Sequence, residues 1–164
     1  MTKIGLLSDT HAWWDEKYLQ YFEECDEIWH AGDIGSDDVA ARLSAIKPFR
    51  AVYGNVDGQS LRLQYPEIAH FTIEKVNVMM THIGGYPGRY NPAIRSELYT
   101  SHPHLFIAGH SHILKVCFDH NLRCLYMNPG AAGRYGFHQV RTLLRFVIDG
   151  ADIKDLEVIE LGHR

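Results

Sequence analysis

One recurring pattern constrains the fold of this chain more than any other feature. A short apolar run is followed by a turn, and the turn carries residues that can bind a metal. In the clearest example, an apolar run from Leu105 leads to two histidines, His110 and His112. Because the functional crevice of an open α/β sheet lies at the carboxyl ends of its strands, this pattern predicts strands that deliver several ligands to one place.

The first third of the chain alternates between apolar runs and stretches with helical spacing. Ser36 has the character of a helix N-cap, because Asp37 and Asp38 follow it in the expected first turn. The predicted order is a strand at 3–7, a helix at 15–25, a strand at 27–30, a helix from 36 that Pro48 ends, and a strand at 49–53. This βαβαβ order predicts parallel strands joined by crossover helices.

The rest of the chain carries mostly strands. We expect a helix at 92–99 that begins with Pro92, and loops at 83–91 and 128–133 where glycine and proline gather. The predicted strands cover 68–74, 76–80, 105–112, 114–118, 123–127, 141–148 and 153–160. Together the two parts predict a mixed α/β sandwich with two facing sheets.

Length, charge and cysteines limit the classes of function. The 164 residues fit one domain spanning 1–164, and a net charge of -4 argues against nucleic-acid binding through a basic face. No stretch approaches the length of a membrane span. The first apolar run is too short for a signal peptide, and the three cysteines form no Cys-x-x-Cys pattern, which indicates reduced thiols in the cytoplasm. Cys117 and Cys124 flank an expected hairpin turn, where two small strand residues are a simpler interpretation than a disulfide.

Seven residues at five strand ends are candidate metal ligands: Asp9, His11, Asp33, Asn55, His82, His110 and His112. Taken singly, each has an ordinary alternative as a turn residue, a helix cap or a hydrogen-bonded histidine. The joint pattern carries the argument, since residues two apart in extended chain project to the same side and could clamp one metal. Among the other histidines, His30 could support a ligand and His138 could contact substrate.

Five motifs resemble, in this order, those of the calcineurin-like metallophosphoesterase superfamily: Asp9-Thr10-His11, Gly32-Asp33, Gly54-Asn55, Thr81-His82 and Gly109-His110-Ser111-His112. The resemblance covers nearly the whole chain, and the compact spacing resembles the small bacterial and archaeal phosphodiesterase branch. It implies a four-layer αββα sandwich, with two mixed β-sheets flanked by helices around a dinuclear metal centre.

By the same resemblance, the first metal would be held by Asp9, His11, Asp33 and His112, and the second by Asp33, Asn55, His82 and His110. Asp33 would bridge the two ions, and the two histidines of the opening pattern would serve different metals. The family usually binds manganese, iron, zinc, nickel or cobalt, and Asp, His and Asn ligands without thiolate suit such metals. We take manganese as the expected metal.

The resemblance implies a metal-dependent phosphodiesterase that acts on small-molecule diesters. Two metals about 3.5–4 Å apart can share a water and lower its pKa, so the expected nucleophile is a metal-bridging hydroxide and not a side chain. Asn55 could also orient the phosphate, and Arg89 could add a bidentate contact to it. A solvated surface loop is an equally good interpretation of the segment that carries Arg89.

The chain departs from the family pattern at two positions. Many relatives have a histidine that protonates the leaving group where this chain has Val56, and many have His-Gly-His where it has His82 followed by Ile83. General acid catalysis is typically worth about 10²–10⁴-fold. Its loss at Val56 favours diesters that carry good leaving groups.

Three alternatives stay open at this point. A broad phosphomonoesterase is the nearest, and a non-enzymatic scaffold similar to a retromer subunit would use the same fold. A metallo-β-lactamase fold is disfavoured, because that group usually has His-x-His-x-Asp-His, whereas His112 is followed here by Ile113 and Leu114. Exposed sheet edges would allow a homodimer.

Overall fold

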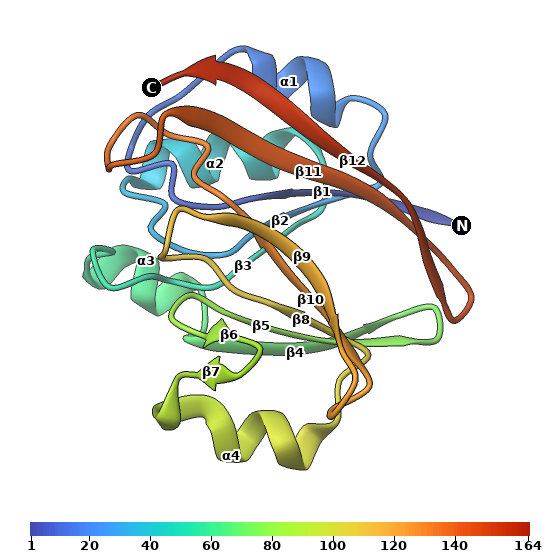
Figure 1. The fold of residues 1–164 in the computed structure, drawn as a ribbon. Helices are drawn as coiled ribbons and strands as arrows, with labels where there is room; N and C mark the ends of the chain where they lie inside the picture. The colour runs from blue at the N-terminus through green and yellow to red at the C-terminus, as the bar shows by residue number, and fades with distance from the viewer.

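Two five-stranded β-sheets pack face to face, with helices on both outer sides (Figure 1). The computed structural model describes residues 1–164. The strands of the first sheet are, in spatial order, β12 (Asp152–His163), β11 (Val140–Asp149), β1 (Thr2–Leu7), β2 (Glu27–His30) and β3 (Phe49–Ala51). Those of the second are β4 (Ile68–Ile73), β5 (Val76–Thr81), β8 (Leu105–Ile107), β10 (Cys124–Pro129) and β9 (Leu114–Asp119).

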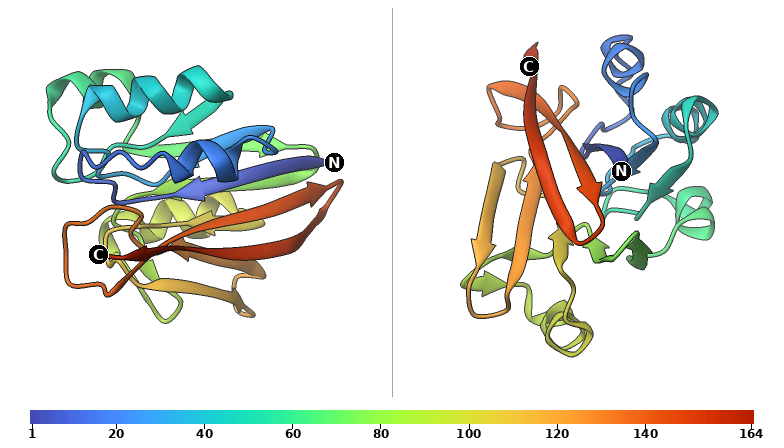
Figure 2. Two further views of the ribbon diagram at one scale, coloured as in Figure 1. Left: turned by 90° about the horizontal axis from the view of Figure 1, so that it is seen from above. Right: turned by 90° about the vertical axis from the view of Figure 1, so that its right-hand side faces the viewer.

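Four helices cover the two outer faces (Figure 2). The first sheet carries α1 (Lys17–Phe22), α2 (Asp37–Ile46) and α3 (Gln59–Gln64), and the second carries α4 (Pro92–Ser101). A two-stranded ribbon, β6 (Gly85–Tyr86) and β7 (Arg89–Tyr90), leads into α4. This arrangement confirms the four-layer αββα sandwich of two mixed sheets. The longest helices have ten residues, and none could cross a bilayer.

Three apolar layers hold the sandwich together, and the two-residue period of the strands sorts side chains among them. In β1, Ile4 and Leu6 enter the core between the sheets, whereas Leu7 faces the helices of the first sheet. In β8, Leu105 joins the core between the sheets and Phe106 packs under α4. The central strands of each sheet are therefore covered on both faces, which leaves the strand ends as the place for polar chemistry.

Strand directions agree with the predicted βαβαβ unit. β1 pairs with β2 and β2 with β3, both in parallel, whereas β11 joins β1 antiparallel. In the second sheet, β5, β8 and β10 are parallel neighbours. Ser36 caps α2 as predicted, because its hydroxyl accepts a hydrogen bond from the Val39 amide at 3.3 Å.

Several predicted boundaries were wrong. The predicted strand 105–112 ends at Ile107, because His110 and His112 have φ values of +71° and +61°, which a strand does not adopt. The strand at 49–53 ends at Ala51, the helix at 15–25 covers only 17–22, and α3 was not expected. The loop at 83–91 contains β6 and β7.

The two cysteines of the β9–β10 hairpin are free thiols and do not face each other. Cys117 lies opposite Tyr126, and Cys124 lies opposite Asp119. The simpler interpretation of two small strand residues is therefore correct.

Candidate metal centre

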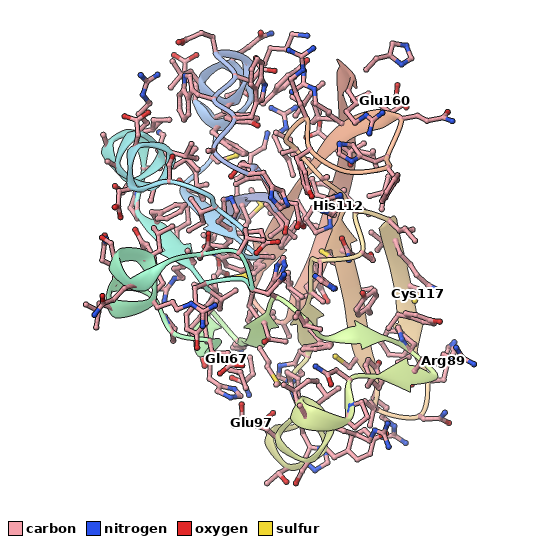
Figure 3. All side chains as sticks on the ribbon, turned by 90° about the vertical axis from the view of Figure 1, so that its left-hand side faces the viewer. Glu67, Arg89, Glu97, His112, Cys117 and Glu160 are labelled. Carbon is pink, nitrogen blue, oxygen red and sulfur yellow. The ribbon has the colours of Figure 1, made fainter.

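The candidate ligands gather at one end of the sandwich, where β1, β2, β3, β5 and β8 all finish. Asp9 and His11 follow β1, Asp33 follows β2, His82 follows β5, and the two remaining histidines follow β8. This end faces the viewer in Figure 3, where His112 lies between the loops of the two sheets. Residues more than 100 positions apart thereby meet, as when the His110 amide donates to Asp9 Oδ2 at 3.1 Å.

Six of the candidates form two groups of three. Within each group the possible ligand atoms lie within 4.8 Å of one another. The first group is Asp9, His11 and His112, and the second is Asp33, His82 and His110. The two histidines from the loop after β8 thus belong to different groups, as the resemblance implied.

Two short distances connect the groups. Asp33 Oδ2 lies 3.1 Å from His82 Nε2 in its own group and 3.5 Å from His11 Nε2 in the other. Asp9 Oδ1 lies 3.1 Å from His112 Nε2 and 3.8 Å from His82 Nε2. The two groups therefore form one continuous cluster of oxygen and nitrogen donors.

Three buried atoms of this cluster have no hydrogen-bond partner: Asp9 Oδ1, His11 Nε2 and His82 Nε2. Leaving buried polar atoms unpaired is costly, so native proteins rarely do it without a ligand, an ion or water. Carboxylate oxygens and imidazole nitrogens without thiolate are the donors that divalent manganese, iron and zinc accept. The residues present therefore fit a pair of divalent metal ions.

The charge balance of the cluster also favours a cation. Burial would raise the pKa of Asp9, but the adjacent imidazoles of His11 and His112 outweigh it and hold that pKa well below its usual range. Burial would lower the pKa of His82, but Asp33 and Asp9 raise it. The carboxylates thus stay ionised, and a bound metal would replace the proton that they stabilise on His82.

The backbone of the centre is unusual. Ten residues other than glycine have positive φ, and five of these are candidate ligands: Asp9, His11, Asp33, His110 and His112. This region of φ is unfavourable for residues with a Cβ and concentrates at functional sites. Local backbone strain at these five residues therefore accompanies the orientation of their side chains in the cluster.

Hydrogen bonds fix the orientation of the ligands. His82 Nδ1–H donates to the Ala31 carbonyl at 2.7 Å, which leaves Nε2, the atom that a metal would take, facing Asp33. Asp9 Oδ2 accepts from the Ser8 hydroxyl at 2.6 Å, so that Oδ1 is left free. Asn128 donates to the Gly109 carbonyl at 3.0 Å and holds the loop that carries both histidines.

The two residues predicted to contact substrate lie in different places. Asn55 is exposed at the edge of a cavity of about 420 Å³, which His82 also lines. Arg89 does not line this cavity, and Figure 3 places it far from His112, at the outer side of the β6–β7 ribbon. The cation that does line the cavity is Arg62, on α3, a helix that the sequence patterns did not reveal.

Comparison with known proteins agrees with this geometry. Residues 2–151 match the family model of the calcineurin-like phosphoesterase superfamily domain. The chain belongs to this superfamily. A probable metallophosphoesterase from Methanothermobacter thermautotrophicus is 30% identical over 114 residues. That alignment covers 66% of this chain and 66% of the relative, just under two thirds of its length.

Solved structures share the fold of this chain at low identity. Wild-type Vps29 from Entamoeba histolytica, complexed with Zn²⁺, has a TM-score of 0.75 at 15% identity, over 96% of this chain and 98% of that one. A predicted phosphoesterase from Streptococcus pneumoniae TIGR4 has a TM-score of 0.73 at 20% identity, over 97% and 89%. Vps29 from Chaetomium thermophilum has a TM-score of 0.76 at 12% identity, over the full length of both chains.

A buried carboxylate that the motifs alone did not single out supports the centre. Asp57 accepts from the amides of Gly54 and Gly35, both at 2.8 Å, and from the Ile34 amide at 3.2 Å. It therefore ties the loop after β2, which carries Asp33, to the loop after β3. The only signal in the sequence was an acid two positions after the Gly-Asn motif.

Replacing Asp57 with Ala is expected to lower the free energy of unfolding by about 3 kcal/mol or more, since three amides lose a charged acceptor. For a chain of this size the melting temperature should fall by roughly 10 °C, which calorimetry can measure. Asp57→Asn keeps one acceptor oxygen and should lose less. Equal melting temperatures for the wild type and Asp57→Ala would contradict this role.

His30 contacts the loops that carry the candidate ligands and makes the free energy of unfolding depend on pH. Its Nδ1 accepts from the Gly32 amide at 3.1 Å, and its Nε2–H donates to Thr10 Oγ1 at 3.0 Å, because that hydroxyl donates to the Ile34 carbonyl. Burial lowers the pKa of His30 from 6.5 to about 4. As the pH falls, His30 therefore takes up a proton near pH 6.5 in the unfolded chain but only near pH 4 in the folded chain.

The metal-free protein should lose stability as the pH falls from 6.5 to 4, because the unfolded state binds more protons in this window. The contribution of His30 to this loss is on the order of 3 kcal/mol. Melting temperatures of the metal-free wild type and of His30→Gln should converge as the pH falls. The exposed histidine His70 provides the control, since His70→Gln should keep the wild-type slope. A wild-type slope in His30→Gln would rule out this origin.

Proposed function

We propose that residues 1–164 form one metallophosphoesterase domain that hydrolyses small-molecule phosphodiesters with two divalent metal ions, most simply manganese, in the cytoplasm. The observation that carries this proposal is the pair of three-residue groups whose buried donor atoms lack partners. Asp33 would be the ligand shared by the two ions, because its Oδ2 lies within 3.5 Å of a histidine from each group. The three cysteines, all free thiols, are consistent with a reducing compartment.

When bound, the metals would supply Lewis acidity and a hydroxide near neutral pH. The protein then has mainly to position the phosphate and balance its charge. Asn55 is suited to the second metal because its amide oxygen can coordinate without adding negative charge, and it lies where a phosphate could also reach it. Arg62 lines the same cavity and offers a positive charge to the substrate.

The residue at position 56 favours diesters with good leaving groups. The Val56 amide donates to Asp33 Oδ1 at 3.0 Å, so this position still supports the metal site. Its side chain is half exposed and carries no proton to donate. Val56 therefore cannot protonate a leaving group that needs a proton, whereas an aryl oxide can depart without one.

The test compares bis(4-nitrophenyl) phosphate with 4-nitrophenyl phosphate, before and after metal removal by a chelator. We expect hydrolysis only after manganese is restored, with the diester at least about tenfold faster in kcat/KM than the monoester. A dialkyl phosphate should be slower still, because its leaving group lacks a general acid worth about 10²–10⁴-fold.

The alternatives give different results in the same assay. Faster hydrolysis of the monoester would favour a broad phosphomonoesterase. Two bound metals without hydrolysis of either ester would favour a non-enzymatic scaffold. We retain this alternative because the chain shares its fold with Vps29.

A further inference from the structure

Exposed aromatic side chains gather beside the metal centre. Tyr135 and Phe137 are 70% and 101% exposed, and both lie in the loop between β10 and β11. Trp13 is 38% exposed in the loop after β1. Scattered exposed apolar residues are ordinary in proteins. These three, however, flank the loops that carry the ligands, and the Tyr135 ring lies 4.9 Å from the ring of His11.

Two hollows border this cluster. One of about 370 Å³ is lined by the candidate ligands His110 and His112 and, from the loop between β10 and β11, by Tyr135, Phe137 and His138. A second of about 320 Å³ lies between His11, Val56 and Tyr135. Tyr135 thus lines both hollows. The larger one has no carboxylate and no Lys or Arg in its lining, and it is lined by two aromatic side chains together with three imidazoles.

The aromatic loop is attached firmly to the centre. The Gly133 amide donates to the Asp9 carbonyl at 3.1 Å, and His138 Nε2–H donates to the Gly133 carbonyl at 2.7 Å. Gly136 packs so closely that a Cβ there would lie 2.2 Å from His112 Nδ1. Because both ends of the segment are held, the aromatic side chains are presented at a set distance from the ligands, which lowers the entropic cost of binding.

The chemistry of this wall selects a flat, uncharged group. Planar rings bind other planar rings by stacking, and every nucleobase presents such a face. Stacking on an aromatic side chain strengthens binding by roughly 5- to 150-fold per base. The Arg134 guanidinium lies 4.6 Å from the ring centroid of Trp13 and adds a positive charge at the edge of the cluster. Because His110 and His112 line the larger hollow, it adjoins the place where the metals would hold a phosphate.

We propose that Tyr135 and Phe137 form a stacking subsite for the nucleobase of a small nucleotide diester, so that the substrates of this phosphoesterase are nucleotides. This inference rests on the proposed function, because the metal centre must hold the phosphate. The net charge of -4 favours a single nucleotide unit over a long nucleic acid, whose many phosphates the protein would repel.

The test measures binding as well as activity. Calorimetric titration of the manganese-loaded protein with adenosine 5′-monophosphate and with ribose 5-phosphate should show roughly 5- to 150-fold tighter binding of the nucleotide. Tyr135→Ala, Phe137→Ala and the double variant should bring this ratio toward one. Tyr99→Ala is the control, since Tyr99 is 45% exposed on α4 and should leave the ratio unchanged. Metal content and circular dichroism establish that each variant is folded and loaded.

A parallel assay separates this inference from the proposed function. It compares a nucleoside 4-nitrophenyl phosphate with methyl 4-nitrophenyl phosphate. We expect a lower KM for the nucleoside ester, and we expect Tyr135→Ala to remove this difference in KM. Equal KM values, or a preference that survives the double variant, would overturn the subsite while leaving the phosphodiesterase intact. Failure to hydrolyse either ester would instead count against the proposed function. Much tighter binding of a ten-nucleotide single strand than of the mononucleotide would overturn the assignment to small nucleotides.

Discussion

Asp33→Ala is expected to remove most of the bound metal and to lower diester hydrolysis by on the order of 10³-fold or more. Asp33 is nearly fully buried, and its Oδ2 is close to histidines of both three-residue groups. Its loss therefore affects both metal sites, whereas the loss of any one histidine affects mainly one. Metal ions contribute several kcal/mol to stabilising a phosphoryl transition state, and each 1.36 kcal/mol is a factor of ten in rate.

The experiment combines metal analysis with hydrolysis of an aryl diester. Asp33→Asn tests the charge alone, because it keeps the size of the side chain and an oxygen that can accept from the Val56 amide. The matched control is Asp38→Ala, an exposed carboxylate on α2 that pairs only with Arg42. If Asp33→Ala kept both metals and the wild-type rate, the dinuclear mechanism would be wrong. Loss of metal from a protein that never hydrolysed esters would support a scaffold.

The sequence predicted the layers of the fold because burial on both faces leaves a strong pattern. β1 and β2 were placed correctly, since each is a short apolar run that ends at a polar turn. The cap at Ser36 was recognisable because N-capping is a local interaction. By contrast, α3 has six residues and buries only Leu61, so its pattern was too weak to distinguish from a loop.

The candidate site was predictable to a similar extent. Ligands that follow strands could be identified one motif at a time, and the family resemblance divided them into the two groups that the structure brings together. The parts that could not be predicted depend on contacts between distant segments. Asp57 was overlooked because its role requires the loops after β2 and β3 to meet. Arg89 was a candidate for a phosphate contact or for a solvated loop, and it lies away from His112 on the β6–β7 ribbon.

The left-handed backbone at the ligands also lies beyond simple patterns. Spacing two residues apart predicted that His110 and His112 would project together, as they would in a strand. Their positive φ values instead turn the chain between them. As a result, the His110 ring lies beside a histidine of the second group, and the His112 ring lies beside a histidine of the first. His110 lies 5.2 Å from the ring of His82, and His112 lies 5.4 Å from the ring of His11.

This division leads to the second large effect. His110→Ala should weaken the metal bound beside Asp33 and His82, and His112→Ala should weaken the metal bound beside Asp9 and His11. Loss of a residue that only supports a ligand costs about 10–100-fold in metal affinity, so loss of the ligand should cost at least as much. Each variant should therefore still take up one manganese ion with near wild-type affinity. Calorimetric titration of the metal-free protein resolves the two binding steps.

The two variants must also differ from each other, because each removes a ligand from a different group. If His110 and His112 both bound a single ion, the two variants would lose the same binding step. The other step would be kept in both. In the arrangement described by the structure, the surviving step in His110→Ala should disappear when His11 is also replaced, and that in His112→Ala should disappear when His82 is also replaced. His120→Ala, an exposed histidine on the β9–β10 turn, should keep both steps. Asp33→Ala, in contrast to either histidine variant, should weaken both steps at once, because Asp33 Oδ2 lies close to a histidine of each group.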